Sequence, residues 1–154
     1  MSKTYSHSFS LLEDEHIELE HLFDSHQRAL LDRNVDTALA VLNTFGDELD
    51  QHIDYEEKTL LPIYAEEGGE TEGGTLKIFQ VEHRKLREDA WRLTRKTEAL
   101  YASPDMMGSI LDLLDEEKMF KGLFHHHALR EKNLLFPRLD ERTTEEQRRR
   151  MLGW

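Results

Sequence analysis

Two His-x-x-x-Glu motifs carry the clearest chemical signal in this sequence. They are His52/Glu56 and His127/Glu131. Residues four apart lie on the same face of a helix, so each motif directs one imidazole and one carboxylate toward the same point. Imidazole nitrogen and carboxylate oxygen are good ligands for iron, and zinc and manganese also accept them. The motifs therefore predict a metal site to which two helices contribute.

The two motifs belong to an internal duplication. A proline follows the histidine of each motif by ten residues, at Pro62 and at Pro137. Upstream of each motif lies a Glu-His-x-x-Leu segment, which contains His16 in the first copy and His83 in the second. The pattern indicates that one helical hairpin occurs twice. Each copy contributes one lone histidine and one His-x-x-x-Glu motif.

The spacing places the paired histidines at the same height in each hairpin. Residues at one height in an antiparallel hairpin are equidistant from its turn. Halfway between His16 and His52 is position 34, and halfway between His83 and His127 is position 105. Both positions lie in short polar segments that are suited to turns. Two hairpins packed with pseudo-twofold symmetry would bring four imidazoles and two carboxylates together.

Four segments have the periodicity of amphipathic helices. Apolar residues and the candidate ligands recur at alternating steps of three and four, as in helices that pack in a bundle. The segments span residues 12–30, 42–60, 76–100 and 110–135, and residues 144–152 are expected to form a short C-terminal helix. Few residues are β-branched, and no segment alternates with period two. We predict an all-α, up-down-up-down four-helix bundle, because the first and last connections are too short for crossovers.

Local signals predict the ends of these helices. The expected N-terminal caps are Ser10 (in a capping box with Glu13), Asp36 and Ser103. Pro62 and Pro137 are expected to bend or end their helices, because proline lacks the N–H that a helix interior uses. The segment 66–74 has the composition of a loop that is too polar and too rich in glycine to pack.

Length, charge and composition exclude several classes of function. The 154 residues suit a single domain over 1–154, with a core at about 8–140 and a C-terminal tail or helix at 141–154. A formal charge of −12 argues against nucleic acid and anionic lipid as partners. The absence of cysteine excludes disulfides and thiolate ligands. No apolar stretch approaches a membrane span of roughly 20 residues, and no signal peptide is evident, so we expect a cytoplasmic protein.

The motifs resemble those of the hemerythrin-like family, the His/His/Glu cation-binding domains, over roughly residues 8–140. The resemblance implies a non-haem di-iron centre in the bundle core, with an oxo or hydroxo bridge and with zinc or manganese as possible substitutes. It implies that one iron is bound by one histidine pair, the other iron by the second pair, and that the two glutamates bridge both ions. These implied ligands are His16 and His52, His83 and His127, and Glu56 and Glu131.

One departure from the oxygen-carrying hemerythrins affects the expected function. Those proteins have a fifth histidine four residues after the third-helix histidine, where this chain has Arg87. The pattern is similar to the four-histidine, two-glutamate subgroup, which includes proteins implicated in iron–sulfur cluster repair and nitric oxide responses. Those repair proteins carry an additional N-terminal domain with a cysteine pair, which is not found in this chain.

The resemblance implies a protein that binds or reacts with O2, NO or peroxide in a sensing, scavenging or redox role. The alternatives are a redox enzyme that reduces NO or peroxide, a repair-type protein, and an iron storage or donation protein. A structural zinc site is a further alternative, although such sites are usually closed and four-coordinate. The sequence leaves open whether the protein is an enzyme, what its redox partner is, and whether it is a monomer or a homodimer.

Other polar residues near the motifs have simpler interpretations. We expect His26 to be a hydrogen-bonded core histidine, and Glu57 to lie on a solvated face, with a substitute ligand as the alternative. Glu117 is predicted at a core-facing position of the fourth helix. Its side chain is expected either to extend to solvent or to mark an access path to the metals. The residues expected at the surface are His7, His21, His125 and His126, the last two with outer contacts to the centre as an alternative.

Overall fold

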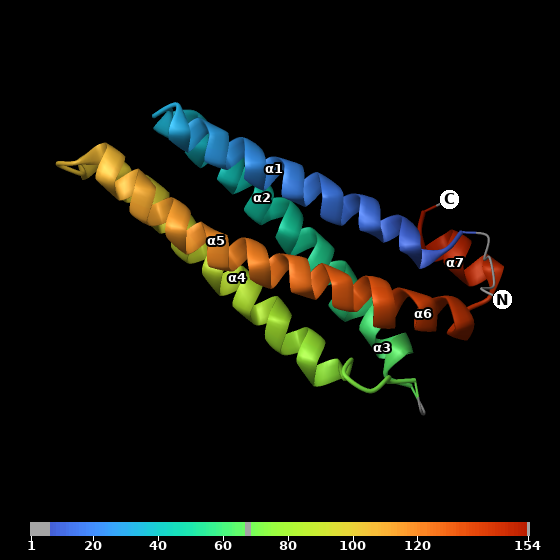
Figure 1. The fold of residues 1–154 in the computed structure, drawn as a ribbon. Helices are drawn as coiled ribbons and strands as arrows, with labels where there is room; N and C mark the ends of the chain where they lie inside the picture. The colour runs from blue at the N-terminus through green and yellow to red at the C-terminus, as the bar shows by residue number, and fades with distance from the viewer. Residues whose placement is uncertain (1–6, 67–68, 154) are drawn as a thin grey trace.

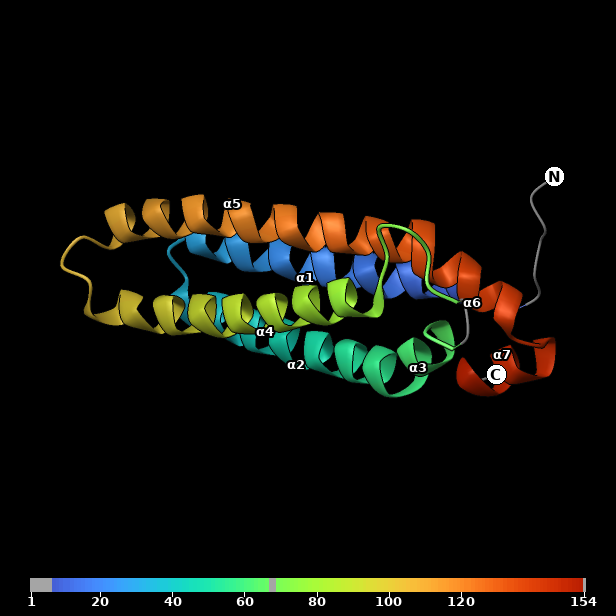
Figure 2. The same ribbon diagram turned by 90° about the horizontal axis from the view of Figure 1, so that it is seen from below.

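The computed structural model describes residues 7–66 and 69–153 as an antiparallel four-helix bundle (Figure 1). The long helices are α1 (Glu13–Leu31), α2 (Val35–Tyr55), α4 (Leu76–Ala99) and α5 (Met106–Arg130). Viewed from below, the α1–α2 and α4–α5 turns lie at one end of the bundle, and α3, α6 and α7 lie at the other (Figure 2). Between residues 7 and 153, excluding 67 and 68, the only β pairing is an isolated bridge. The predicted all-α bundle is confirmed.

The helix caps differ from the predicted ones at three places. Asn34, not Asp36, caps α2, because its side chain accepts the N–H of Thr37. Asp105, not Ser103, caps α5 by accepting the N–H of Gly108. Helix α2 therefore begins two residues earlier than the predicted cap implies, and α5 begins two residues later. Short polar turns offer several cap candidates, and tertiary packing of the helices selects among them.

The N-terminal capping box predicted at Ser10 is also wrong. Residues Phe9–Leu12 form the 3-10 helix η1, so α1 begins at Glu13, two residues later than a cap at Ser10 predicts. Ser8 caps η1 and also donates its hydroxyl to Asp140, which accepts the backbone N–H of Phe9 at 2.8 Å. This long-range contact replaces the local capping box and holds the start of the chain on the C-terminal segment.

The two prolines shape the helices without ending them. A π-helical turn, η2 (Glu56–Leu60), links α2 to α3 (Leu61–Tyr64), and a second, η4 (Glu131–Leu135), links α5 to α6 (Phe136–Arg142). In both turns a backbone N–H bonds to the glutamate carbonyl five residues before it. Since Pro62 and Pro137 provide no N–H, the regular ladder is broken at equivalent places. The predicted breaks therefore appear as π turns, which are frequent at functional sites.

The segment between the two hairpins packs more closely than its composition indicates. Tyr64 is fully buried, and its hydroxyl contacts Thr71 Oγ1 at 2.8 Å and donates to the Gly74 carbonyl. Gly74 is buried against Leu134, where a Cβ would come within 3.0 Å of a side-chain carbon. The loop prediction is correct in type, but the expectation that the loop does not pack is wrong. Residues 67–68 lie outside the described residues.

The C-terminal residues cover the end of the bundle opposite the two hairpin turns. Helix α7 (Glu145–Met151) begins with a capping box between Thr144 and Gln147. The buried Arg148 donates to the carbonyl oxygens of Asp140 and Thr143, and the Tyr55 hydroxyl donates to the carbonyl of Met151. The short C-terminal helix is confirmed.

The hydrophobic core is divided into two clusters. The larger contains Phe23, Phe45, Phe120 and Phe124 and extends to the hairpin turns, and the smaller contains Phe9, Tyr64, Phe79 and Phe136 at the other end. On every long helix the predicted ligands lie between these clusters. Apolar packing above and below therefore fixes the helix positions, and the polar residues occupy a single layer between. Within the described residues, no helix is long and apolar enough to cross a membrane.

Candidate metal centre

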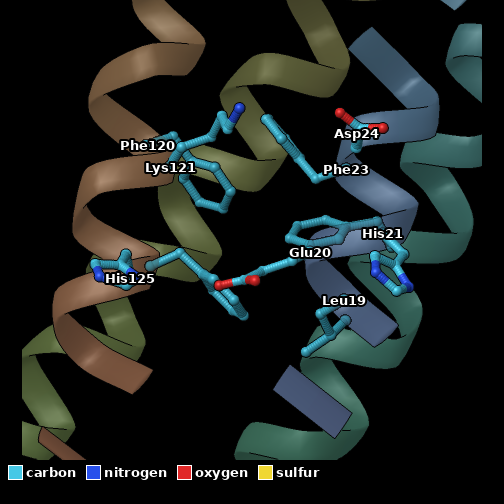
Figure 3. A pocket seen from close by; sticks show the side chains of 10 residues that line it. Leu19, Glu20, His21, Phe23, Asp24, Phe120, Lys121 and His125 are labelled. Atoms are coloured by element: carbon cyan, nitrogen blue, oxygen red, sulfur yellow. The ribbon is translucent and has the colours of Figure 1, made fainter. Parts of the chain in front are cut away.

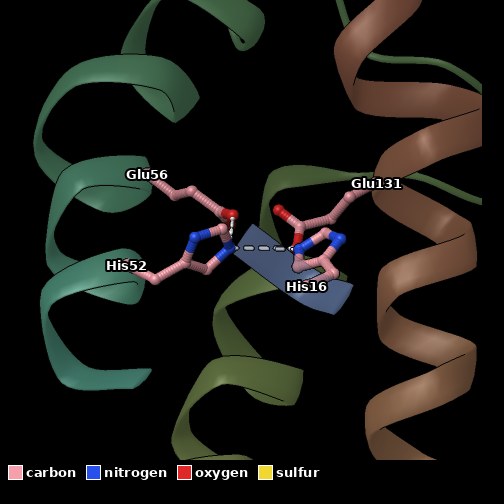
Figure 4. A group of neighbouring side chains, drawn as sticks. All are labelled: His16, His52, Glu56 and Glu131. Carbon is pink, nitrogen blue, oxygen red and sulfur yellow. Dashed lines mark hydrogen bonds and ion pairs between the residues drawn. The ribbon is translucent and has the colours of Figure 1, made fainter. Parts of the chain in front are cut away.

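The first histidine pair meets across the α1–α2 hairpin as its spacing predicts. His16 Nε2 lies 3.1 Å from His52 Nε2 and 3.0 Å from Glu131 Oε1. Figure 4 shows these three side chains and Glu56 pointing toward one another from different elements of the bundle. His52 and Glu56 are four residues apart and form a close ion-pair contact. The first His-x-x-x-Glu motif is thus completed by groups from α1 and η4.

The second histidine pair repeats this arrangement across the α4–α5 hairpin. The His83 and His127 rings are 4.8 Å apart with an interplanar angle of 68°, and the His16 and His52 rings are 4.9 Å apart at the same angle. His83 Nε2 lies 3.0 Å from Glu56 Oε2, and His127 Nε2 lies 2.8 Å from Glu131 Oε1. The matching geometry agrees with the internal duplication predicted from the sequence.

The two glutamates lie between the histidine pairs and are shared by both. One group of potential ligands contains His16 and His52, the other contains His83 and His127, and both include Glu56 and Glu131. Within each group the ligand atoms lie within 4.8 Å of one another. An ion with bonds of about 2.0–2.2 Å has opposite ligand atoms about 4.0–4.4 Å apart. Small side-chain movements would therefore let each group close around one cation.

Burial makes this layer costly without a bound cation. The six residues are at most 6% exposed, and Glu56, His83 and Glu131 are fully buried. Glu56 Oε1, Glu131 Oε2 and His127 Nε2 have no hydrogen bond of acceptable geometry, although imidazoles or carboxylates approach some of them closely. Buried polar atoms without partners cost several kcal/mol in desolvation. Nitrogen and oxygen atoms converging from six residues fit a divalent or trivalent cation.

A second layer of carboxylates orients three of the four imidazoles. Glu15 Oε2 lies 2.5 Å from His52 Nδ1, Glu57 Oε1 lies 3.1 Å from His83 Nδ1, and Glu82 Oε1 lies 3.1 Å from His127 Nδ1. A proton on Nδ1 that is donated to a carboxylate leaves the lone pair of Nε2 directed into the centre. This is the tautomer that a metal-ligating histidine requires.

These outer carboxylates were only partly predictable. Glu57 was expected on a solvated face, but its side chain is about one-third exposed and contacts His83. Glu15 and Glu82 each precede a lone histidine in the sequence, and adjacent residues point about 100° apart on a helix. Each therefore reaches a histidine on the neighbouring helix. The repeated Glu-His dipeptide was the available signal.

The duplication breaks at the fourth outer position. Glu57 follows Glu56, whereas the residue after Glu131 is Lys132, which lies 3.8 Å from Glu13. Among the residues that the structure describes, no carboxylate contacts His16 Nδ1. The histidine pair on α1 and α2 therefore has one outer carboxylate, and the pair on α4 and α5 has two. The two halves of the centre are electrostatically unequal.

Electrostatics in the layer favour protonated imidazoles when no cation is bound. Burial opposes charge on His127, but the carboxylates of Glu131, Glu82 and Glu56 outweigh it and raise the pKa of His127 to about 10. The pKa of His52 is likewise raised well above its usual value, because Glu56, Glu131 and Glu15 outweigh burial. Burial would raise the pKa of Glu131, yet the adjacent His127 holds it well below the usual range. Protons and cations therefore compete for the same negative site.

Two further polar core residues, His26 and Glu117, form a pair that is separate from the metal layer. His26 Nδ1 donates to the Ala38 carbonyl at 2.8 Å, and His26 Nε2 lies 2.7 Å from Glu117 Oε2. Both side chains are fully buried, so the structural role expected for His26 is confirmed. Glu117 neither extends to solvent nor opens a path to the centre, because His26 holds it in the core. No pattern in the sequence predicts this pairing, because the two residues are 91 positions apart.

The other histidines lie outside the centre. His21, His125 and His126 are exposed, as expected. His7 is only partly exposed, and its Nδ1 lies 3.7 Å from Glu145 on α7. The expectation of a fully solvated His7 is therefore wrong, because α7 covers this side of the chain start.

Comparison with known families agrees with this geometry. The family model for the hemerythrin HHE cation-binding domain matches residues 7–139, which is most of the chain. The chain belongs to the hemerythrin HHE cation-binding family. Searches of curated proteins and of solved structures found no match. The hemerythrin-like match covers all six buried histidine and glutamate ligand candidates, so a cation-binding role for this domain is consistent with both fold and site.

Proposed function

We propose that this hemerythrin-like domain binds two iron ions in the polar layer and uses them to bind or react with O2, NO or peroxide. His16 and His52 would hold one ion, and His83 and His127 the other. Glu56 and Glu131 would bridge the two ions. Bound iron would supply a redox-active centre with positions for exogenous ligands.

The observation that carries this proposal is the sharing of both carboxylates between the two histidine pairs. If only one cation were bound, one pair of imidazoles and the buried carboxylate oxygens beside it would have no cation to bind. Two cations use every converging atom and offset the negative charge of both glutamates. Imidazole with carboxylate is a donor set that suits iron, whereas structural zinc prefers a closed site with four ligands.

The donor set leaves room for a small ligand on each ion. Two imidazoles and the two shared carboxylates would supply four donor atoms to each cation, and iron accepts up to six. Arg87, at the position of the missing fifth histidine, binds Asp50 and Asp54 at the surface, with N–O distances of 2.8 and 2.9 Å. Arg87 also lies 4.0 Å from the outer carboxylate of Glu57, but it supplies no ligand atom to the layer, so each bound ion would keep positions for water or an added ligand.

The surroundings of the layer favour small, uncharged ligands. The His16 ring lies 6.0 Å from Phe124 and 5.9 Å from Phe136, and the His127 ring lies 6.4 Å from Phe79. A large or charged molecule would lose its hydration against these rings without gaining partners. Diatomic gases and neutral peroxide lose little on entering such surroundings.

Ligand titration of the iron-loaded protein tests the proposal. The reduced protein should develop a new near-ultraviolet or visible band on addition of O2 or NO, with saturation at a fixed ratio of ligand to protein. The variant His127→Leu should lose iron and the band, and the exposed neighbour variant His126→Leu should keep both. An unchanged spectrum with iron bound would refute gas binding. Repeated turnover with an added reductant would identify an enzyme.

A further inference from the structure

A polar cleft of about 380 Å³ opens between α1 and α2, beside the first histidine pair. Three carboxylates line it and no lysine or arginine does; the lining includes Glu15, Glu18, Glu48, Gln51, His52 and Tyr55. No hydrogen bond or ion pair joins Glu18 or Glu48 to another residue within 7–66 and 69–153, the part of the chain that the structure describes. These two carboxylates therefore give the cleft a negative charge that no side chain neutralises.

His52 belongs both to this cleft and to the polar layer. Its Nδ1 lies 2.5 Å from Glu15 Oε2 in the cleft, and its Nε2 lies 3.1 Å from His16 Nε2 in the layer. Next to Nε2, the fully buried Glu56 Oε1 has no hydrogen bond of acceptable geometry. The Glu15 side chain is half exposed, and exposed side chains change rotamer within nanoseconds. Movement of this carboxylate and rotation of one imidazole ring would therefore open a path from the cleft to the layer.

The cleft has room for a hydrated cation. At about 30 Å³ per water, six waters occupy about 180 Å³, which is roughly half of the 380 Å³ in the cleft. A cleft lined by charges of one sign raises the local concentration of counter-ions and speeds their association by about tenfold to thousandfold. The carboxylates would therefore concentrate cations directly beside a candidate ligand.

The second hairpin does not repeat the negative charge of this cleft. Counted from the paired histidines, Lys85 takes the place of Glu18, and Leu123 takes the place of Glu48. Lys85 is itself paired with Asp89 at 2.9 Å. Both hairpins supply equivalent ligands to the layer, so the layer does not need the two free carboxylates in order to form. Their position beside one histidine pair alone requires another explanation.

The outer carboxylates of the two hairpins also differ in their freedom to move. Glu82, which is equivalent to Glu15, accepts a hydrogen bond from Arg130 at 3.1 Å in addition to its contact with His127. The Glu82 side chain is 14% exposed, against 50% for Glu15. Arg130 stands at the position equivalent to Tyr55, so the second hairpin has a positive charge where the first has a phenol. A cation would therefore meet less repulsion and a more mobile carboxylate at the first hairpin.

The cleft between α1 and α5 does not offer such a route. Figure 3 shows Lys121 among its lining residues, on the helix opposite Glu20 and Asp24. None of the six candidate ligands lines this cleft. A cation that entered it would be repelled by the lysine and would reach no histidine or glutamate of the layer.

We propose that the cleft between α1 and α2 is the route by which divalent cations enter and leave the polar layer. The proposal rests on the two-cation centre proposed above and adds the direction of its loading. Glu18 and Glu48 would attract the hydrated cation, and Glu15 would bind it while the His52 ring rotates. The first histidine pair would then exchange ions with solvent, and the second pair would receive its ion through the layer.

Rates of Co²⁺ uptake and release by the full chain test this route, because Co²⁺ bound by imidazole and carboxylate absorbs visible light. Gln51→Trp places an indole in the cleft and removes no ligand. Since a route is used in both directions, uptake into the metal-free chain and release into excess chelator should slow by the same factor, about tenfold or more. The dissociation constant should not change. His126→Trp makes a matched change at the equivalent position of the second hairpin, and it should leave both rates unchanged.

The charge of the cleft has its own comparison, which does not depend on a bulky substitution. At low ionic strength the double variant Glu18→Gln/Glu48→Gln should take up Co²⁺ about tenfold more slowly than the unmodified chain, and added salt should reduce this difference. The exposed pair Glu88→Gln/Asp115→Asn changes the net charge equally on α4 and α5, and it should have little effect on the rate.

Equilibrium binding separates failure of the route from failure of the centre. If the unmodified chain binds two Co²⁺ ions, equal rates in the two tryptophan variants, or in the two double variants, would overturn the route and leave the centre intact. Fewer than two bound ions in the unmodified chain would refute the centre, and the route with it.

Discussion

Removing one partner of the buried pair His26 and Glu117 should destabilise the bundle more than any surface substitution. Both side chains are fully buried, and their closest atoms are 2.7 Å apart. Glu117→Leu leaves His26 Nε2 without an acceptor while its Nδ1 still donates to Ala38. Loss of one partner of a buried ion pair costs about 3–5 kcal/mol. Since about 1 kcal/mol lowers Tm by about 2–4 °C at this chain length, Tm should fall by about 6–20 °C.

Two further variants isolate the pair interaction. Glu117→Gln retains a hydrogen-bonding side chain of the same shape and should cost about 1.5 kcal/mol or less. The double variant His26→Leu/Glu117→Leu replaces both partners with apolar groups and should recover most of the lost stability. The coupling energy from the double-mutant cycle should therefore be large.

Urea unfolding measures these differences for the unmodified chain, the single variants His26→Leu and Glu117→Leu, and the double variant, which together make the cycle, and for Glu117→Gln. His26 lies ten residues after His16 on α1, roughly 15 Å along the helix, so the metal content of the variants should not change. If Glu117→Leu is as stable as the unmodified chain, or if the two single substitutions add without coupling, the reasoning about this pair is wrong. Loss of metal from a folded Glu117→Leu protein would contradict the separation of the pair from the metal layer.

Three other predictions concern the outer carboxylates, pH and the helix cap. Glu82→Gln should weaken metal binding about tenfold to hundredfold in a chelator competition, because it weakens the contact that orients His127, while the exposed control Glu88→Gln should have no effect. In the metal-free protein the raised pKa of His127 adds stability that is complete below about pH 6.5 and is lost as the pH rises through about 10. Urea unfolding at both ends of that range should show a decrease, and an increase would contradict the ion-pair network. Asn34→Ala should cost about 1 kcal/mol of unfolding free energy, whereas Asn43→Ala within the exposed part of α2 should cost nothing; equal values would refute the cap assignment.

The sequence predicted the parts of the structure that depend on periodicity. Apolar spacing gave the four helices, and the duplicated motifs gave the six residues that meet in the polar layer. The midpoint of each histidine pair, at positions 34 and 105, coincides with the observed caps Asn34 and Asp105. Such features are local or repeat along the chain, so one sequence contains enough information to find them.

Features that depend on contacts between distant segments were not predictable in the same way. The pairing of His26 with Glu117, and of Glu15 with His52, depends on how the helices are rotated against one another. The π turns after Glu56 and Glu131 depend on a balance between proline and packing that no local pattern specifies. The cap at Ser8 was missed because it depends on Asp140, which is 132 residues away.

An anomalous difference map from crystals of the iron-loaded chain, measured at the iron absorption edge, tests the central proposal most directly. Two peaks per chain are expected about 3.5–4 Å apart, one beside His16 and His52 and the other beside His83 and His127. Both peaks should contact the carboxylates of Glu56 and Glu131. A single peak, or peaks outside this layer, would contradict the two-iron centre.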